Sequence, residues 1–333
     1  MESDWKMKTT KATEKRIAGK PILTVDKDLA GDNSSGGKLP VDWVLNRLNP
    51  SPEDEWDRLR DFLSLGNEDI QAMLTTVEVL FKRGIELVVG NYEYLLKNHE
   101  TAAILGWEQG ADPEHLAERR RFFTVWLART LGMDLSHDFA LYLFRAGQYH
   151  AGHGRRHIHV PEVYVTGAIS LVNATFARFL NEEMPGALIV PGALAAWNKV
   201  LSLHLHMMLL GYRSAIEFDQ GDFPLHVALF GRMRTFLGCD EFTLNLIKGE
   251  TTETALSKIF NYYPQIRDKV FDIAWQPGER IDALGTPWMT VAKGYRIKYG
   301  WRLLVNGNDI SYGQGQDTPI LPGDKMQIFP PGR

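Results

Sequence analysis

Cysteine is almost missing from this sequence: Cys239 is the only one among 333 residues. One thiol cannot form a disulfide within the chain, so covalent cross-links do not stabilise the fold. The 37 basic residues are outnumbered by 41 acidic ones, which leaves no basic field for nucleic acid or anionic lipid. A charged-then-apolar leader and a long uncharged apolar run are also missing. We therefore expect a soluble, cytoplasmic protein with no nucleic-acid partner and no membrane partner.

The length and the 44% share of hydrophobic residues fit two folded domains. Segment 31–38 mixes glycine, serine and charge without an apolar period, so the first residues cannot bury enough surface to fold. The pattern is helical from Asp42 to Phe218 and changes to short alternating runs after Pro224. The sequence thus predicts an α+β protein with a flexible tail at 1–38, an all-α domain at 39–217 and a mixed domain at 222–333.

Helix periodicity dominates the predicted all-α domain. Apolar residues from Ile70 to Tyr92 recur at spacings of three and four, which predicts one long helix. A second helix begins at Asp112-Pro113, where aspartate caps and proline preorganises the first turn. Further helices are predicted at 137–151, 161–181 and 191–216.

The predicted helix at 137–151 places Phe139, Leu143, Ala146 and His150 on one stripe, so that His150 points inward. A neutral imidazole is the commonest nitrogen ligand for iron or zinc. An inward histidine in a helical core can equally be a hydrogen-bonded structural residue, and the spacing alone leaves both interpretations open.

The mixed domain has the order of elements expected of a β-grasp fold. Strands are predicted at 225–230 and 242–247, and they are followed by a helix at 253–262. A strand at 302–305, a turn at Asn306-Gly307 and a last strand at 325–329 complete the fold. Segment 273–299, which contains several glycines and prolines, is interpreted as an inserted loop or hairpin.

The segment around His150 resembles the proximal-histidine segment of globin-coupled sensors and protoglobins. It reads Arg145-Ala146-Gly147-Gln148-Tyr149-His150-Ala151 and is followed by Val160-Pro161-Glu162-Val163-Tyr164-Val165-Thr166-Gly167, where the family has Arg-Ile-Gly, two residues and then histidine. The likeness extends over about residues 39–217. It implies a globin-like domain that holds haem b, with His150 as the ligand of the iron.

Two further segments carry the resemblance. Asn91–Leu96 resembles the family's Phe-Tyr pair, and Tyr92 matches the tyrosine that faces the bound gas. Segment 122–127 resembles the helix with the family's tryptophan, here Trp126, and makes Phe122 and Phe123 candidates for the roof of the haem. The resemblance implies a diatomic gas ligand, with oxygen favoured, that the Tyr92 hydroxyl stabilises by a hydrogen bond. An amphipathic core role for Tyr92, and ordinary core roles for both phenylalanines, are the alternatives.

The chain departs from the family pattern after His150, because the passage to the next helix is longer and Ala146 replaces an isoleucine. If the register slips, His153 becomes the axial ligand, although the helical stripe favours His150. The remaining histidines of the passage suggest a zinc cluster, contacts to haem propionates or a solvated loop; the residues concerned are His153, His157 and His159, with Arg155 and Arg156. His204 and His206 lie two residues apart on a helix, so they do not share a metal.

The C-terminal part resembles the small sulfur carriers of molybdopterin and thiamine synthesis. The likeness rests on segments 227–234, 304–310 and 321–331, which occur in the family's order. It implies a ubiquitin-like β-grasp fold. These carriers activate a C-terminal Gly-Gly carboxylate on a free tail, whereas this chain ends in Gly332-Arg333. The alternative is a β-grasp domain that serves as a protein-interaction surface.

The leading hypothesis is a haem-based gas sensor without enzymatic activity, which signals to an unknown protein through the β-grasp domain. A carrier or adaptor of cofactor biosynthesis with a haem-free helical scaffold is the alternative. A haem enzyme, such as a peroxidase or nitric-oxide dioxygenase, ranks last because no distal acid-base pair is evident. We expect a homodimer that pairs through the apolar stripe from Leu194 to Tyr212.

Overall fold

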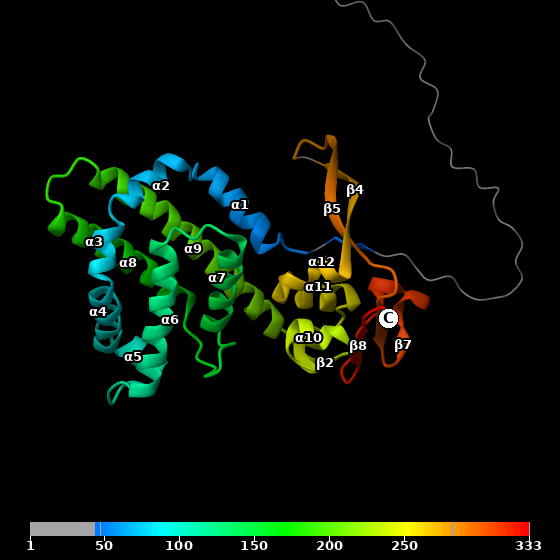
Figure 1. Cartoon of the computed structure of the whole chain (residues 1–333). Coiled ribbons are helices and arrows are strands. Elements are labelled where there is room, and N and C mark those ends of the chain that lie inside the picture. The colour runs from blue at the N-terminus through cyan, green and yellow to red at the C-terminus, as the bar shows by residue number, and fades with distance from the viewer. Residues whose placement is uncertain (1–43, 47, 282, 333) are drawn as a thin grey trace, which may run out of the picture. The chain divides into compact units, whose positions relative to one another are not determined.

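The structure is a computed structural model that describes residues 44–46, 48–281 and 283–332 of the chain. The tail predicted at 1–38 lies outside the described residues. From Pro52 to Asp219 the chain is helical, and from Phe223 onwards strands and helices mix (Figure 1). The predicted fold class, an all-helical domain followed by a mixed β-grasp domain, is confirmed.

The helical part begins with α1 and ends with the long helix α9. Asp112 and Ser136 cap α6 and α7, because their side-chain oxygens accept from the backbone N–H groups of Glu114 and Phe139. The helices are α1 (Pro52–Phe62), α2 (Asn67–Leu74), α3 (Val77–Lys82), α4 (Gly84–Lys97), α5 (His99–Leu105), α6 (Pro113–Leu131), α7 (His137–His150), α8 (Glu162–Glu183) and α9 (Val190–Asp219).

The single long helix predicted from Ile70 to Tyr92 is wrong, because the structure divides it into α2, α3 and α4. At the first break, the Thr76 hydroxyl donates to the Met73 carbonyl oxygen and accepts from Trp197 Nε1 at 2.9 Å. A threonine hydroxyl that bonds to a nearby backbone carbonyl competes with the backbone hydrogen bonds that would continue the helix. At the second break, Arg83 has non-helical backbone angles. The apolar period survives both breaks, which is why the sequence reads as one helix.

The apolar stripe proposed for dimerisation faces the chain's own core, so the choice of this stripe as the interface is wrong, and the homodimer itself stays a prediction. Leu201, Met208 and Tyr212 on α9 are buried within the chain, where α9 packs against α7 and α8. One described helix, α8, is long and apolar enough to cross a membrane. A single helix of this kind is weak evidence, because the core helices of soluble proteins pass the same test.

The C-terminal sheet has the mixed strand order of a β-grasp fold, β3-β2-β8-β6-β7. β2 pairs antiparallel with β3 and parallel with the last strand, β8, and α11 closes the apolar core. The elements are β2 (Phe223–Leu229), α10 (Arg232–Leu237), β3 (Glu241–Leu246), α11 (Thr252–Tyr262), α12 (Arg267–Val270), β6 (Arg302–Val305), β7 (Asn308–Asp309) and β8 (Lys325–Phe329), with short 3₁₀ turns η1 (Pro264–Ile266), η2 (Ile310–Tyr312) and η3 (Gly315–Asp317).

The segment predicted as an inserted loop or hairpin is a β-hairpin. Its strands, β4 (Phe271–Ile281) and β5 (Pro287–Ile297), pair antiparallel along their whole length. The short strand β1 (Val44–Leu45) adds to the base of β5, opposite Arg296 and Tyr295. The hairpin thus forms a separate three-stranded sheet beside the five-stranded one.

Candidate functional site

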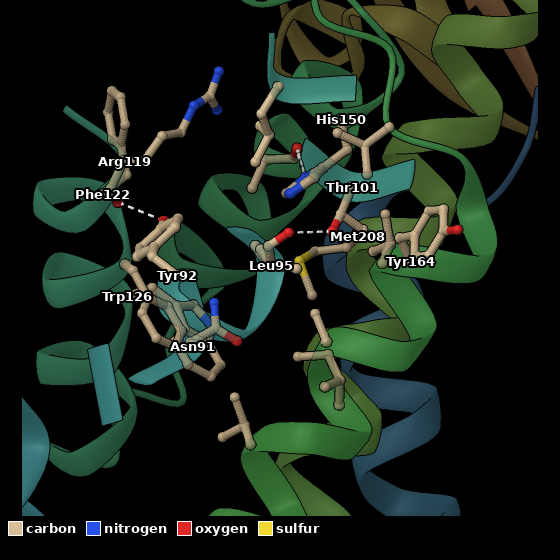
Figure 2. Close-up of a pocket in the computed structure, with 18 of the residues that line it drawn as sticks. Asn91, Tyr92, Leu95, Thr101, Arg119, Phe122, Trp126, His150, Tyr164 and Met208 are labelled. Atoms are coloured by element: carbon tan, nitrogen blue, oxygen red, sulfur yellow. Dashed lines mark hydrogen bonds between the residues drawn. The ribbon is translucent and has the colours of Figure 1, made fainter. Parts of the chain in front are cut away.

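The helical domain contains a largely apolar cavity, lined by residues of α4, α5, α6, α7, α8 and α9. The volume of this cavity is about 220 Å³. Figure 2 shows Tyr92, Phe122 and Trp126 on one side and His150, Tyr164 and Met208 on the other. The lining includes every predicted site residue, that is Tyr92, Phe122, Phe123, Trp126 and His150, together with Asn91, Leu95, Thr101, Arg119, Tyr142, Ala146, Tyr164, Ile169 and Met208 among others.

His150 occupies the last turn of α7 and has one of its ring nitrogens anchored. Nδ1 lies 2.7 Å from the carbonyl oxygen of Ala146, one helical turn earlier, so that Nδ1–H donates and Nε2 is the unprotonated nitrogen. Among the described residues, Nε2 has no hydrogen-bond partner. Burial lowers the pKa of His150 and outweighs the opposing effect of the Ala146 carbonyl. The ring is therefore a neutral nitrogen donor in a cavity wall.

Tyr92 lines the cavity from α4, but its hydroxyl is already engaged. It donates to the carbonyl oxygen of Arg119 on α6 at 2.8 Å. Burial raises the pKa of Tyr92, so the phenol keeps its proton. The ring also packs edge-on against Phe123 and Trp107. In this arrangement Tyr92 links α4 to α6, and only a rotation of its hydroxyl would direct the proton into the cavity.

The three aromatic residues predicted on α6 play different parts in the wall. Phe123 and Trp126 stack at 5.3 Å between ring centroids, and the Trp126 side chain is buried. Phe122 has 49% of its surface exposed. Phe123 and Trp126 thus form a fixed wall, whereas Phe122 has room to move.

Sequence reasoning missed Arg119, Asn91 and Tyr164 as lining residues. Arg119 lies three residues before Phe122 and seven before Trp126, so helical spacing places it on the same face of α6. That spacing is a signal that could have identified it. Its Nε donates to His115 Nε2 at 2.9 Å, which holds the side chain along α6.

The other histidines of the passage after α7 do not line the cavity. Both His153 nitrogens are engaged, Nδ1 by the Tyr262 hydroxyl at 2.8 Å and Nε2 by Asp219 at 2.9 Å. His159 Nε2 lies 2.8 Å from the Tyr212 hydroxyl. Arg156 binds Glu118 at the start of α6. The described residues include no group of three metal-binding side chains, and the passage is held to its neighbours by hydrogen bonds and an ion pair.

His204 is fully buried behind the cavity wall. Its ring stacks on Trp56 and meets Trp126 edge-on, with centroids 6.1 and 6.0 Å away. Neither nitrogen has a hydrogen-bond partner among the described residues. Burial lowers the pKa of His204 to about 3. The residue is a neutral core histidine.

We expect acid to destabilise the protein through His204. Below pH 6.5 the unfolded chain protonates this histidine, whereas the folded chain does so only near pH 3, so stability falls with pH across that window. Between pH 7 and pH 5 the loss amounts to about 2 kcal/mol at 1.36 kcal/mol per pKa unit. Urea unfolding at both values checks this. His204→Leu removes that part of the pH dependence, whereas His226→Leu on β2 keeps it; an unchanged slope in His204→Leu contradicts the assignment.

The C-terminal tail is packed against the β-grasp domain, contrary to the free tail of a sulfur carrier. A Cβ on Gly231 would lie 2.9 Å from Pro330, and one on Gly300 would lie 2.9 Å from Pro331. Phe329 stacks on Phe230 with centroids 4.0 Å apart. Arg333 lies outside the described residues. These contacts hold the tail as far as Pro331 on the domain surface.

A family model described as Protoglobin matches residues 52–217. No curated protein matches the chain significantly. Among solved structures, the globin domain of the Geobacter sulfurreducens globin-coupled sensor is 18% identical with a TM-score of 0.40, and the match covers 47% of this chain and 97% of that domain.

The C-terminal part is similar to small archaeal modifier protein 1 of two organisms. The Methanosarcina acetivorans protein is 23% identical with a TM-score of 0.24, and the match covers 33% of this chain and 93% of that one. The Haloferax volcanii protein is 16% identical with a TM-score of 0.23, with coverage of 33% and 96%.

Proposed function

We propose, because a Protoglobin family model matches residues 52–217, that the helical domain binds haem b in the cavity lined by His150 and serves as a sensor of a diatomic gas, oxygen in the first instance. Haem held there would supply the iron to which a diatomic gas could bind. We further propose that the domains comprise residues 39–217 and 222–333, that the protein acts in the cytoplasm, and that the β-grasp domain passes the signal to a protein partner rather than catalysing a reaction.

The residues around the cavity fit such a group. The walls are mainly aliphatic and aromatic, as the faces of a porphyrin require. His150 offers the unprotonated nitrogen, and its Nδ1–H bond to Ala146 sets the tautomer and orients the ring, as is usual for metal-binding histidines. The cavity is smaller than the roughly 300–1,000 Å³ typical of ligand sites. Exposed Phe122 is the wall residue we propose to move aside.

We propose that Tyr92 adjusts the affinity for the gas. Its hydroxyl has one proton, and that proton is given to the Arg119 carbonyl. Stabilising a polar ligand in the cavity therefore requires Tyr92 to exchange one hydrogen bond for another, and the net gain is the difference between two bonds of similar strength. The expected consequence is that the preference for oxygen over carbon monoxide is only small.

The observation that carries the proposal is the half-buried, neutral imidazole of His150, which is oriented at Nδ1 and, among the described residues, unpartnered at Nε2, in an apolar cavity. Its test is the visible absorption spectrum of the full chain supplied with haem, ferric and ferrous, with and without oxygen or carbon monoxide. We expect a Soret band that shifts with each gas. A protein that stays colourless after haem supply overturns the proposal.

Signalling through the β-grasp domain is proposed from the contacts at the end of α7. Gln148, two residues before His150, donates from Nε2 to the Tyr262 carbonyl oxygen of α11 at 2.8 Å. His153, three residues after His150, lies 2.8 Å from the Tyr262 hydroxyl. Tyr262 also stacks on Phe218 of α9 with centroids 4.4 Å apart. One residue before His150 in the sequence and one residue after it thus both form hydrogen bonds to Tyr262 of the β-grasp domain.

We expect gas binding to change hydrogen exchange at the end of α11 through these contacts. In the wild-type chain, carbon monoxide should alter the exchange rates of amides 259–263 about fivefold, which corresponds to a coupling of about 1 kcal/mol. Gln148→Leu should abolish the change while leaving the Soret band intact. Asn198→Leu on the exposed side of α9 is the matched control and should retain it. Equal responses in the two variants would exclude this route.

A further inference from the structure

The apolar cavity of the helical domain has one permanently charged side chain among the described residues that line it, the guanidinium of Arg119. Figure 2 shows Arg119 on the same side of the cavity as Tyr92 and Phe122, across from His150. Burial lowers the pKa of His150, and the charge of Arg119 lowers it further. Burial raises the pKa of Tyr92, and the charge of Arg119 opposes that rise. The positive charge of Arg119 therefore influences groups on both sides of the cavity.

This charge has no anionic partner within the part of the chain that the structure describes. Arg119 is half-buried, and its one hydrogen bond there runs from Nε to His115 Nε2 at 2.9 Å, so both Nη groups are left without a partner. The adjacent carboxylate, Glu118, is bound by Arg156 at 2.9 Å. A cation beside an apolar space is costly unless an anion binds to it. The cavity therefore lacks the anion that Arg119 requires.

The one bond that Arg119 forms competes with another bond on the same ring. Trp107 Nε1 donates to His115 Nδ1 at 3.1 Å, while Arg119 Nε donates to His115 Nε2. Burial lowers the pKa of His115, and a neutral imidazole has only one nitrogen that accepts. The Trp107 indole is buried and has a single N–H, whereas the guanidinium has five. The bond to Arg119 is therefore the one that the ring gives up at the lower cost.

We propose that Arg119 is the carboxylate-binding residue of this cavity and pairs with a propionate of the haem, an inference that rests on the proposed function. A guanidinium binds a carboxylate through two parallel N–H bonds, and the Nη groups of Arg119 are available for this. The lining fits a ligand with an apolar body and a carboxylate at its edge, which is the chemistry of a porphyrin with propionate side chains. A neutral diatomic gas offers no charge for Arg119 to pair with.

The test compares the affinities of the full chain for ferric haem and for haem dimethyl ester, whose esterified propionates carry no charge, by absorbance titration in one solvent mixture. We expect the wild-type chain to bind haem about tenfold more tightly than the ester, the size of a charged hydrogen bond. Arg119→Leu should lose this preference by weakening haem binding alone, and Arg119→Lys should retain part of it. Arg121→Leu removes a charge from an exposed residue of α6 that does not line the cavity, and it should behave as the wild type.

The ester separates the loss of a charged contact from damage to the cavity, because a variant with a distorted wall binds both compounds less tightly. Equal weakening for haem and the ester in Arg119→Leu overturns the assignment. An unchanged preference together with a faster loss of oxygen also overturns it, and assigns Arg119 to the gas instead. A wild-type chain that binds both compounds equally well overturns this inference alone, whereas a chain that binds neither compound overturns the proposed function as well.

Discussion

The His150→Ala chain is expected to fold and to lose haem. Removing the imidazole takes away the one histidine among the described residues that line the cavity, so no comparable iron ligand remains in that lining. The fraction of haem retained after gel filtration should fall at least tenfold, with the Soret band weakened and moved. Added imidazole should restore a Soret band, because the deletion opens a space of the same shape beside Ala146.

His153→Ala is the matched control for this experiment, since it deletes an imidazole three residues later on the same segment. It removes the bonds to Tyr262 and Asp219 and leaves the cavity wall unchanged. We therefore expect wild-type haem retention together with a weaker contact to α11. Loss of the Soret band in His153→Ala, with retention in His150→Ala, would reverse the ligand assignment.

Sequence periodicity was sufficient to predict the helical stripe that brings His150 inward and the order of strands in the β-grasp domain. Both depend on local rules, namely the spacing of apolar residues and the turn and capping residues between elements. Phe139 and Leu143, predicted on the inner face of α7, are fully buried. The same rules could not reveal the breaks between α2, α3 and α4, because the break at Thr76 depends on a bond from Trp197, 121 residues away.

The chemistry inside the cavity was predictable only in part. The resemblance assigns Tyr92 to the cavity wall, and Tyr92 does line the cavity. A sequence does not specify what the Tyr92 hydroxyl binds, and in the structure its partner is a backbone carbonyl of another helix. The exposure of apolar residues on the β4–β5 hairpin likewise depends on how far its strands extend beyond the core of the β-grasp domain. These features are set by tertiary geometry, whereas Arg119 follows the helical period and was overlooked.

Gly147, three residues before His150, marks where α7 and α9 touch backbone to backbone. A Cβ placed on Gly147 would lie 1.8 Å from the carbonyl oxygen of Met208, and one on Gly211 would lie 1.8 Å from that of Phe144. The contact is reciprocal, and its atoms belong to helical backbone that cannot rotate away as a side chain can. The glycine of the Arg-Ala-Gly segment is thus required by close packing beside the candidate ligand.

We expect Gly147→Ala to lower the free energy of unfolding by about 3 kcal/mol or more, at the upper end of overpacking effects, because α7 must move away from α9. Gly167→Ala on α8 is the control, since a Cβ there meets no atom within 4 Å and should add about 0.5–1 kcal/mol through helix propensity. Urea unfolding of the haem-free chains measures both. If Gly147→Ala is as stable as Gly167→Ala, the two helices are not in backbone contact, and α9 does not hold His150 in position.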